Sequence, residues 1–196
     1  MGKLKRHGLI FLAASLAMVS VKATELNGLR VEPPKPIKAA QLIDHNGRSR
    51  PFPENNGRWK LVFFGYTRCP DVCPTTMFTV QQAVKKLGED ARSLDIAFIS
   101  IDGQRDKPKE LERFVSYYGK QVTGFTGALR NIKEIESQFG VTTRRFQGKT
   151  ALAYTLQHSV FLYLLDPDNR LRVMYSGATL PSVLSEDMRQ HLKRSS

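Results

Sequence analysis

The chain contains two cysteines, Cys69 and Cys73, separated by three residues. They lie between residues 59–64, an apolar run typical of a buried strand, and residues 74–87, whose apolar spacing predicts a helix. Unpaired backbone N–H groups and the helix dipole at such a strand-to-helix turn favour a thiolate. Two thiolates four positions apart can bind one soft metal ion or close a reversible disulfide. Both chemistries stay open on the cysteines alone.

A metal ion held by two thiolates needs a further ligand, and the chain has four histidines. His7 falls in the N-terminal segment, His45 in a predicted turn, and His191 near the C-terminus. His158 remains, directly before the apolar run 159–165, the predicted strand expected to lie beside the cysteine turn. A histidine beside a strand is more often structural than metal-binding, so the residues alone leave both roles open.

The elements that must position these residues follow from hydrophobic patterning. Residues 41–44 and the turn through Asn46-Gly47 predict a β-hairpin. Further strands are predicted at residues 59–66, 94–101, 159–165 and 172–175, and helices at residues 74–87, 108–118, 131–139 and 181–192. A hairpin, strand–helix–strand units and a terminal hairpin with a helix predict an α/β, thioredoxin-like fold with an N-terminal β-hairpin extension.

The N-terminal 23 residues have the layout of a secretory signal. Lys3, Lys5 and Arg6 precede residues 9–21, an uncharged apolar run of 13 residues, and Ala23 ends a small-residue cleavage pattern. A retained membrane anchor is the alternative, although a spanning helix needs about 20 apolar residues. We therefore expect residues 1–23 to be a signal peptide or an N-terminal membrane anchor.

The remaining chain divides into a linker and one domain. Residues 24–37 contain three prolines and predict an extended linker, and residues 38–196 are long enough for a single domain with its own core. Export implies an oxidising compartment, but two cysteines this close together constrain too little chain to act as a structural staple. Their role is therefore expected to be chemical.

Composition limits the partners. The formal net charge is +12, but the basic residues are dispersed and no basic stripe with interleaved aromatic residues is present. This distribution argues against nucleic-acid binding. Attraction to an acidic partner surface or to anionic lipid is consistent with the charge.

The cysteine segment resembles the Sco/SenC family of copper-binding cytochrome oxidase assembly proteins. Further segments of the chain resemble the same family. The matching segments are Phe64-Gly65-Tyr66-Thr67-Arg68-Cys69-Pro70-Asp71-Val72-Cys73-Pro74-Thr75-Thr76, Phe98-Ile99-Ser100-Ile101-Asp102 with Arg105-Asp106 and Pro108, Phe125-Thr126-Gly127, and Tyr154 with His158-Ser159 and Tyr163-Leu164-Leu165-Asp166-Pro167.

The resemblance implies that Cys69, Cys73 and His158 bind one copper ion per chain, as Cu(I), Cu(II) or both. It implies a metallochaperone, rather than an enzyme, that delivers copper to the binuclear copper centre of cytochrome c oxidase subunit II or to another copper enzyme. The expected location is the periplasm or the outer face of the inner membrane, with membrane association if the N-terminus is not cleaved. Gln157 stands where the family usually has Asp, which leaves the preferred copper oxidation state open.

Two other functions involve the same cysteines. In a thiol–disulfide oxidoreductase, Cys69 would attack and Cys73 would resolve, forming the redox disulfide between them. Residues 142–164 lack the proline that thioredoxin-type reductases place near their cysteines, so reduction of a dedicated copper-site partner is the version kept as an alternative. A peroxiredoxin-like function is disfavoured, because the Thr and Pro that such a site needs are replaced by Pro70 and Tyr66.

Overall fold

The computed structural model describes residues 28–150 and 153–193, so the predicted signal or anchor, residues 1–23, lies outside the described residues. Within the described residues, none of the helices has the length and apolar character needed to cross a membrane. The strands are β1 (Leu29–Pro36), β2 (Ala40–Asp44), β3 (Ser49–Phe52), β4 (Trp59–Gly65), β5 (Leu94–Ser100), β6 (Val122–Thr126), β7 (Thr143–Gln147), β8 (Tyr154–His158), β9 (Phe161–Leu165) and β10 (Arg170–Ser176). The α-helices are α1 (Val72–Leu87), α2 (Pro108–Val115), α3 (Leu129–Phe139) and α4 (Pro181–Lys193).

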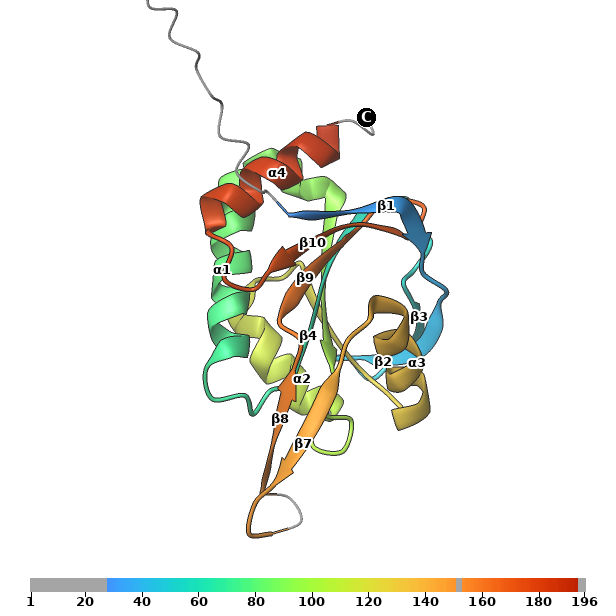
Figure 1. Ribbon diagram of the computed structural model, residues 1–196, viewed down its shortest axis with the longest axis vertical. Coiled ribbons are helices and arrows are strands. Elements are labelled where there is room, and N and C mark those ends of the chain that lie inside the picture. The colour runs from blue at the N-terminus through green and yellow to red at the C-terminus, as the bar shows by residue number, and fades with distance from the viewer. Residues whose placement is uncertain (1–27, 151–152, 194–196) are drawn as a thin grey trace, which may run out of the picture.

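The core of the fold is an eight-stranded sheet in the order β1-β10-β9-β4-β5-β6-β2-β3. The central strands β4, β5 and β6 are parallel and are joined through α1 and α2, whereas β9 runs antiparallel to β4. Helices α1, α2 and α4 cover one face of the sheet and α3 covers the other (Figure 1). The predicted α/β class and the N-terminal hairpin, formed by β2 and β3, are confirmed.

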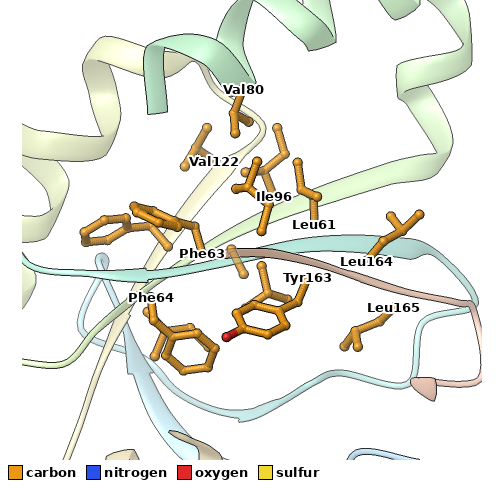
Figure 2. Close-up of a cluster of buried hydrophobic side chains, with 14 of the residues drawn as sticks. Leu61, Phe63, Phe64, Val80, Ile96, Val122, Tyr163, Leu164 and Leu165 are labelled. Atoms are coloured by element: carbon orange, nitrogen blue, oxygen red, sulfur yellow. The ribbon is translucent and has the colours of Figure 1, made fainter. Parts of the chain in front are cut away.

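Strand β4 is buried along its whole length because helices cover both faces of the sheet. Successive side chains alternate between the faces, so Leu61 and Phe63 lie on the side of Val80 in α1, whereas Phe64 and Tyr163 lie on the opposite side (Figure 2). Below the sheet, the ring of Phe64 packs against Phe139 of α3 with 5.1 Å between centroids. This two-sided packing fixes the end of β4, where the cysteine turn begins.

Residues 24–27 of the predicted linker lie outside the described residues, and most of the remainder is strand β1, which pairs with β10 at the edge of the sheet. The pairing shifts register between Arg30 and Lys35, where Pro33 and Pro34 stand. Proline has no N–H to donate, so it interrupts a ladder and is tolerated at an edge strand. The mixed polar and proline composition hides this strand from hydrophobic patterning.

A second sheet was not anticipated from the sequence. Strands β7 and β8 form an antiparallel hairpin that is separate from the main sheet and projects from the molecule (Figure 1). His158 is the last residue of β8, paired with Thr143, rather than a residue of the strand that follows. The histidine therefore comes from the small second sheet, whereas the cysteines follow a strand of the main sheet.

Candidate metal centre

The two cysteines lie at the junction of β4 and α1, at different depths. Helix α1 begins at Val72, two residues earlier than predicted, so Cys73 lies in its first turn and Cys69 lies in the turn before the helix. The sulfurs are therefore not one turn apart along a helix. Instead, the Cys73 backbone N–H donates to Cys69 Sγ at 3.4 Å. Cys73 is fully buried, whereas Cys69 is partly exposed, and both are free thiols.

Space for the Cys73 sulfur comes from Gly65, the last residue of β4. A Cβ atom at position 65 would lie 2.9 Å from Cys73 Sγ and 2.9 Å from a ring carbon of Phe98. Neither neighbour can retreat easily, because both are fully buried. The glycine therefore allows the buried sulfur to pack directly against the end of the strand.

The turn that leads to the cysteines is held by Asp106, a buried residue just before α2. Its carboxylate accepts the Thr67 backbone N–H at 2.8 Å, the Thr67 hydroxyl at 2.7 Å and the Ser100 hydroxyl at 2.7 Å. Burial raises the pKa of Asp106, although these hydrogen bonds oppose that rise. The carboxylate thus joins the loop after β5 to the cysteine turn.

The hairpin brings His158 to the buried cysteine. His158 Nε2 lies 3.6 Å from Cys73 Sγ, and Nδ1 lies 2.9 Å from the carbonyl oxygen of Ser159. Because a carbonyl only accepts hydrogen bonds, we assign the proton to Nδ1, which leaves the Nε2 lone pair directed at the sulfur. The rings of Phe63 and Tyr66 lie 6.2 and 6.3 Å from the imidazole, between centroids, and flank it.

The pKa values of the two thiols are shifted in opposite directions. A hydrogen bond from the Cys73 thiol, assisted by the backbone N–H groups of Asp71 and Cys73, lowers the pKa of Cys69 to about 5, although burial opposes this. The same interaction with Cys69, together with burial, raises the pKa of Cys73. At neutral pH the partly exposed sulfur is therefore a thiolate and the buried sulfur keeps its proton.

The donor types suit copper chemistry, since thiolates prefer Cu(I) and imidazole is a good ligand for Cu(II). The structure brings Cys69 next to Cys73 and Cys73 next to His158. No group of three or more His, Cys, Asp or Glu side chains with the geometry to hold a metal ion occurs in the part of the chain that the structure describes.

The remaining histidines in the described ranges lie elsewhere. His45 Nδ1 accepts the Gly124 N–H at 3.1 Å, and His191 packs its ring 5.8 Å from that of Trp59. His7 lies outside the described residues. Of the histidines in the described residues, His45, His158 and His191, only His158 has a defined contact with a cysteine.

Several residues that shape the site were not identified from the sequence as doing so, among them Gly65, Asp106 and the β7–β8 hairpin. A signal for β8 was available, because Tyr154, Leu156 and His158 alternate with Thr155 and Gln157, the period of a strand. For Gly65 and Asp106 no local pattern points to the role, because each acts on a residue that the fold alone brings near.

Comparison with known proteins gives a consistent assignment. The family model described as SCO1/SenC matches residues 33–193. The SCO2-like protein of Rickettsia conorii is 31% identical over 150 residues, which cover 76% of this chain and 73% of the relative. The mitochondrial SCO2 homolog of Homo sapiens is 28% identical over 153 residues, 77% of this chain and 58% of that protein. The chain thus matches less than two thirds of the length of the human relative.

Solved structures agree on the fold. The copper-bound structure of Bradyrhizobium japonicum ScoI has a TM-score of 0.72 and 31% sequence identity, and the match covers 82% of this chain and 99% of that one. The apo Sco1 solution structure from Thermus thermophilus has a TM-score of 0.73 and 26% identity, with coverage of 86% and 95%. The predicted thioredoxin-like fold is confirmed by these neighbours.

Proposed function

The chain belongs to the SCO1/SenC family, and from this membership we propose that it is an exported copper metallochaperone that serves cytochrome c oxidase assembly. The proposed cargo is one copper ion, held by Cys69, Cys73 and His158, and the proposed recipient is the binuclear copper site of oxidase subunit II. The observation that carries the proposal is the approach of His158 Nε2 to Cys73 Sγ, 3.6 Å, next to a second cysteine. Copper in the 31% identical Bradyrhizobium japonicum structure supports the choice of metal.

The depth of the three side chains suggests an order of ligand exchange. Cys69 is partly exposed and ionised at neutral pH, so an incoming copper ion or partner ligand meets this sulfur first. Cys73 is fully buried, and its thiol must lose its proton when it binds a metal ion, whereas His158, like Cys69, is partly exposed. Release to a partner would proceed in the opposite direction, with Cys69 the last protein ligand to leave.

A second function is favoured by the acidity of Cys69. A thiolate beside a protonated thiol is the arrangement that starts thiol–disulfide exchange. Cys69 would attack a partner disulfide and release one partner thiolate; Cys73, after losing its proton, would then displace the second. The chain ends as the Cys69–Cys73 disulfide, and the partner gains two electrons, with one proton released by Cys73 and one taken from solvent. Such a step would keep a copper-site partner reduced before metal transfer.

The proposed location is the periplasm or the outer face of the inner membrane. It rests on the basic and apolar N-terminal segment, which has the layout of a signal or anchor, and on a net charge of +12 that suits an acidic partner or anionic surface. Comparing the N-terminus of the mature protein in membrane and soluble fractions separates cleavage after Ala23 from a retained anchor.

Copper binding to fully reduced residues 24–196 tests the proposal. We expect one copper per chain, with sulfur-to-copper charge-transfer bands for Cu(II). Cys69→Ala and Cys73→Ala together should abolish tight binding, while Lys86→Ala, at an exposed position on α1, should leave it unchanged. The absence of tight copper binding, together with reduction of a disulfide substrate, would replace the metallochaperone by the oxidoreductase.

A further inference from the structure

A cavity of about 580 Å³ lies against the β7–β8 hairpin, whose strand β8 ends at His158. Its walls come from the hairpin, from the loop after β5 and from the beginning of α3. We call it the hairpin groove and define it by six lining residues, three apolar and three cationic. These are Ile101, Leu129, Leu156, Lys107, Lys133 and Arg145.

The groove leads toward His158. Alternate residues of a strand share a face, so Leu156, which lines the groove, and His158, two positions on, lie on the same face of β8. Two residues of a strand span about 7 Å. Across the hairpin, Arg145 is paired with Leu156 and Thr143 with His158. The groove therefore extends along the face of the hairpin that carries His158.

The charge that the groove presents is positive. Among the described residues that line the groove, the carboxylate is Asp102. It is only 4% exposed and is bound by the Arg105 guanidinium and the Tyr154 hydroxyl. Lys107 Nζ donates to the carbonyl of Gly103 at 2.8 Å, a neutral group that leaves the positive charge in place.

The two other cations are positioned around the same opening. The guanidinium of Arg145 lies 3.7 Å from the ring centroid of Tyr154 and donates to the Gln147 side-chain oxygen at 2.8 Å. Lys133 is paired with Glu136 at 2.6 Å and is half exposed. Together with Lys107, these cations make the lining of the groove basic.

An apolar surface accompanies these cations. Leu129, at the first position of α3, is 66% exposed, and the partly buried Leu156 also lines the groove. An apolar floor with a cationic rim is complementary to an apolar side chain flanked by carboxylates. Neither a purely acidic nor a purely apolar ligand would use both parts.

We propose that the hairpin groove docks the copper-exchanging partner through a segment in which a large apolar side chain is flanked by Asp or Glu. The inference rests on the proposed function, because it assumes a protein that exchanges metal at the adjacent centre. The apolar side chain occupies the space between Leu129 and Leu156, and the carboxylates face Lys107 and Arg145. Docking there holds the partner's own ligands beside His158 and the cysteines, so affinity and metal exchange are obtained at neighbouring surfaces.

The test uses the reduced chain and two synthetic hexapeptides, acetyl-Glu-Asp-Phe-Leu-Glu-Asp and its neutral counterpart acetyl-Gln-Asn-Phe-Leu-Gln-Asn. Amide chemical shifts locate binding and fluorescence polarisation measures Kd. We expect the acidic peptide to shift amides around the groove and to bind more weakly as salt rises. Lys107→Glu and Leu129→Gln should each raise Kd by about tenfold, the size of one important interface contact.

Two substitutions serve as matched controls. Lys86→Glu makes the same charge change in the last turn of α1, and Tyr117→Gln removes another exposed apolar side chain, 78% exposed. Both should leave Kd unchanged. The proposal is overturned if the controls weaken binding as much as the groove variants, if the neutral peptide binds equally well, or if the shifts lie elsewhere. Saturation of the groove by free phenylacetate at the peptide's affinity would assign it to a small carboxylate ligand and also overturn the proposal.

Copper affinity, measured on the same variants, separates this inference from the proposed function. Lys107→Glu and Leu129→Gln should bind copper as the unaltered chain does, since neither residue is a proposed ligand. Copper binding without groove-located peptide binding refutes the docking site and leaves the metallochaperone standing. Peptide binding at the groove by a chain that binds no copper supports the docking site and refutes the copper function.

Discussion

The cysteine pair carries a single negative charge at neutral pH, because each thiol changes the acidity of the other. The hydrogen bond from the Cys73 thiol lowers the pKa of Cys69 to about 5, and burial helps to keep Cys73 protonated. Cys69, which is partly exposed, is therefore the nucleophile and the first metal ligand. Cys73, which is buried, keeps its proton. This division of roles follows from the hydrogen bond between the two thiols and from their different burial, since both residues are the same amino acid.

Alkylation of Cys69 by iodoacetamide should be fast and nearly independent of pH above about pH 6. A lowered pKa means that the thiolate is present throughout that range and is lost only as the pH falls through about 5. The measurement is the alkylation rate at Cys69, by mass spectrometry, from pH 4 to 9.

Cys73→Ala provides the matched comparison for that profile. It removes the largest cause of the lowered pKa, so the midpoint of the Cys69 profile should move upward and the rate at pH 6 should fall. An unaltered chain whose profile already has its midpoint between pH 8 and 9 would contradict the assigned hydrogen bond.

His158→Ala should weaken Cu(II) binding more than Cu(I) binding. Two thiolates can hold the monovalent ion, whereas the divalent ion gains more from an imidazole nitrogen. Competition with a chelator selective for each oxidation state measures the two affinities. His45→Ala, a change at a histidine near β6, should leave both unchanged, and an equal loss of both affinities in His158→Ala would refute the assigned role.

The candidate ligands could be named from the sequence, but their environment could not. Cysteine spacing and the resemblance single out Cys69, Cys73 and His158 without coordinates. The space left by Gly65 and the acidity of each thiol depend on burial, which is created by residues such as Phe98 that are distant along the chain. Local sequence patterns do not predict those contacts.

At the scale of elements, the cysteine turn is attached to the neighbouring strand by a single carboxylate. Asp106 accepts three hydrogen bonds, two from Thr67 and one from Ser100 at the end of β5. The backbone N–H of Thr67 donates to this carboxylate at 2.8 Å. The position of the turn therefore depends on an oxygen acceptor at residue 106.

Asp106→Ala should destabilise the turn, because it leaves the Thr67 N–H without its acceptor. A buried orphan donor costs about 1–3 kcal/mol. We expect the Thr67 amide to exchange with solvent at least about tenfold faster, as such a cost implies. Asp106→Asn keeps one oxygen for this N–H, so its exchange should stay close to that of the unaltered chain. Equal acceleration in both variants would show that charge, rather than the acceptor, holds the turn.

Element boundaries show where sequence patterning succeeds and where it fails. The buried strand β4 and the helices α1 and α4 have strong hydrophobic patterns and were predicted to within two residues at each end. Strand β1 was missed because prolines and exposed polar residues obscure it, and β7 because three of its residues are Thr143, Arg144 and Arg145. Edge and hairpin strands need no buried face, so they leave little trace in the pattern.

For the whole molecule, α4 is joined to the sheet by a buried polar contact. The hydroxyl of Tyr175, on β10, donates to Asp187 of α4 at 2.6 Å, and both residues are almost completely buried. His191 and Arg30 also approach this carboxylate, at 3.6 and 3.8 Å. The contact ties the last helix, the sheet and the edge strand β1 into one unit.

Tyr175→Phe should lower the free energy of unfolding by about 1.5–3 kcal/mol, the range for a hydrogen bond to a charged group. Tyr163→Phe is the matched control, because the buried Tyr163 hydroxyl has no hydrogen-bond partner among the described residues. Removing the Tyr163 hydroxyl should leave the free energy of unfolding unchanged. Urea unfolding followed by circular dichroism compares the two, and a larger loss for Tyr163→Phe would contradict the assignment.

The sulfur and nitrogen donors of the candidate centre come from separately built parts of the chain. Both cysteines depend on the packing of β4 and α1, whereas His158 is carried by a ribbon outside the main sheet. Mutations that change the length, stiffness or charge of the β7–β8 hairpin can move His158 without changing the packing around Cys69 and Cys73. Sequence variation in the β7–β8 hairpin can therefore change the position of His158 and the preferred partner together. The packing around the cysteines stays the same.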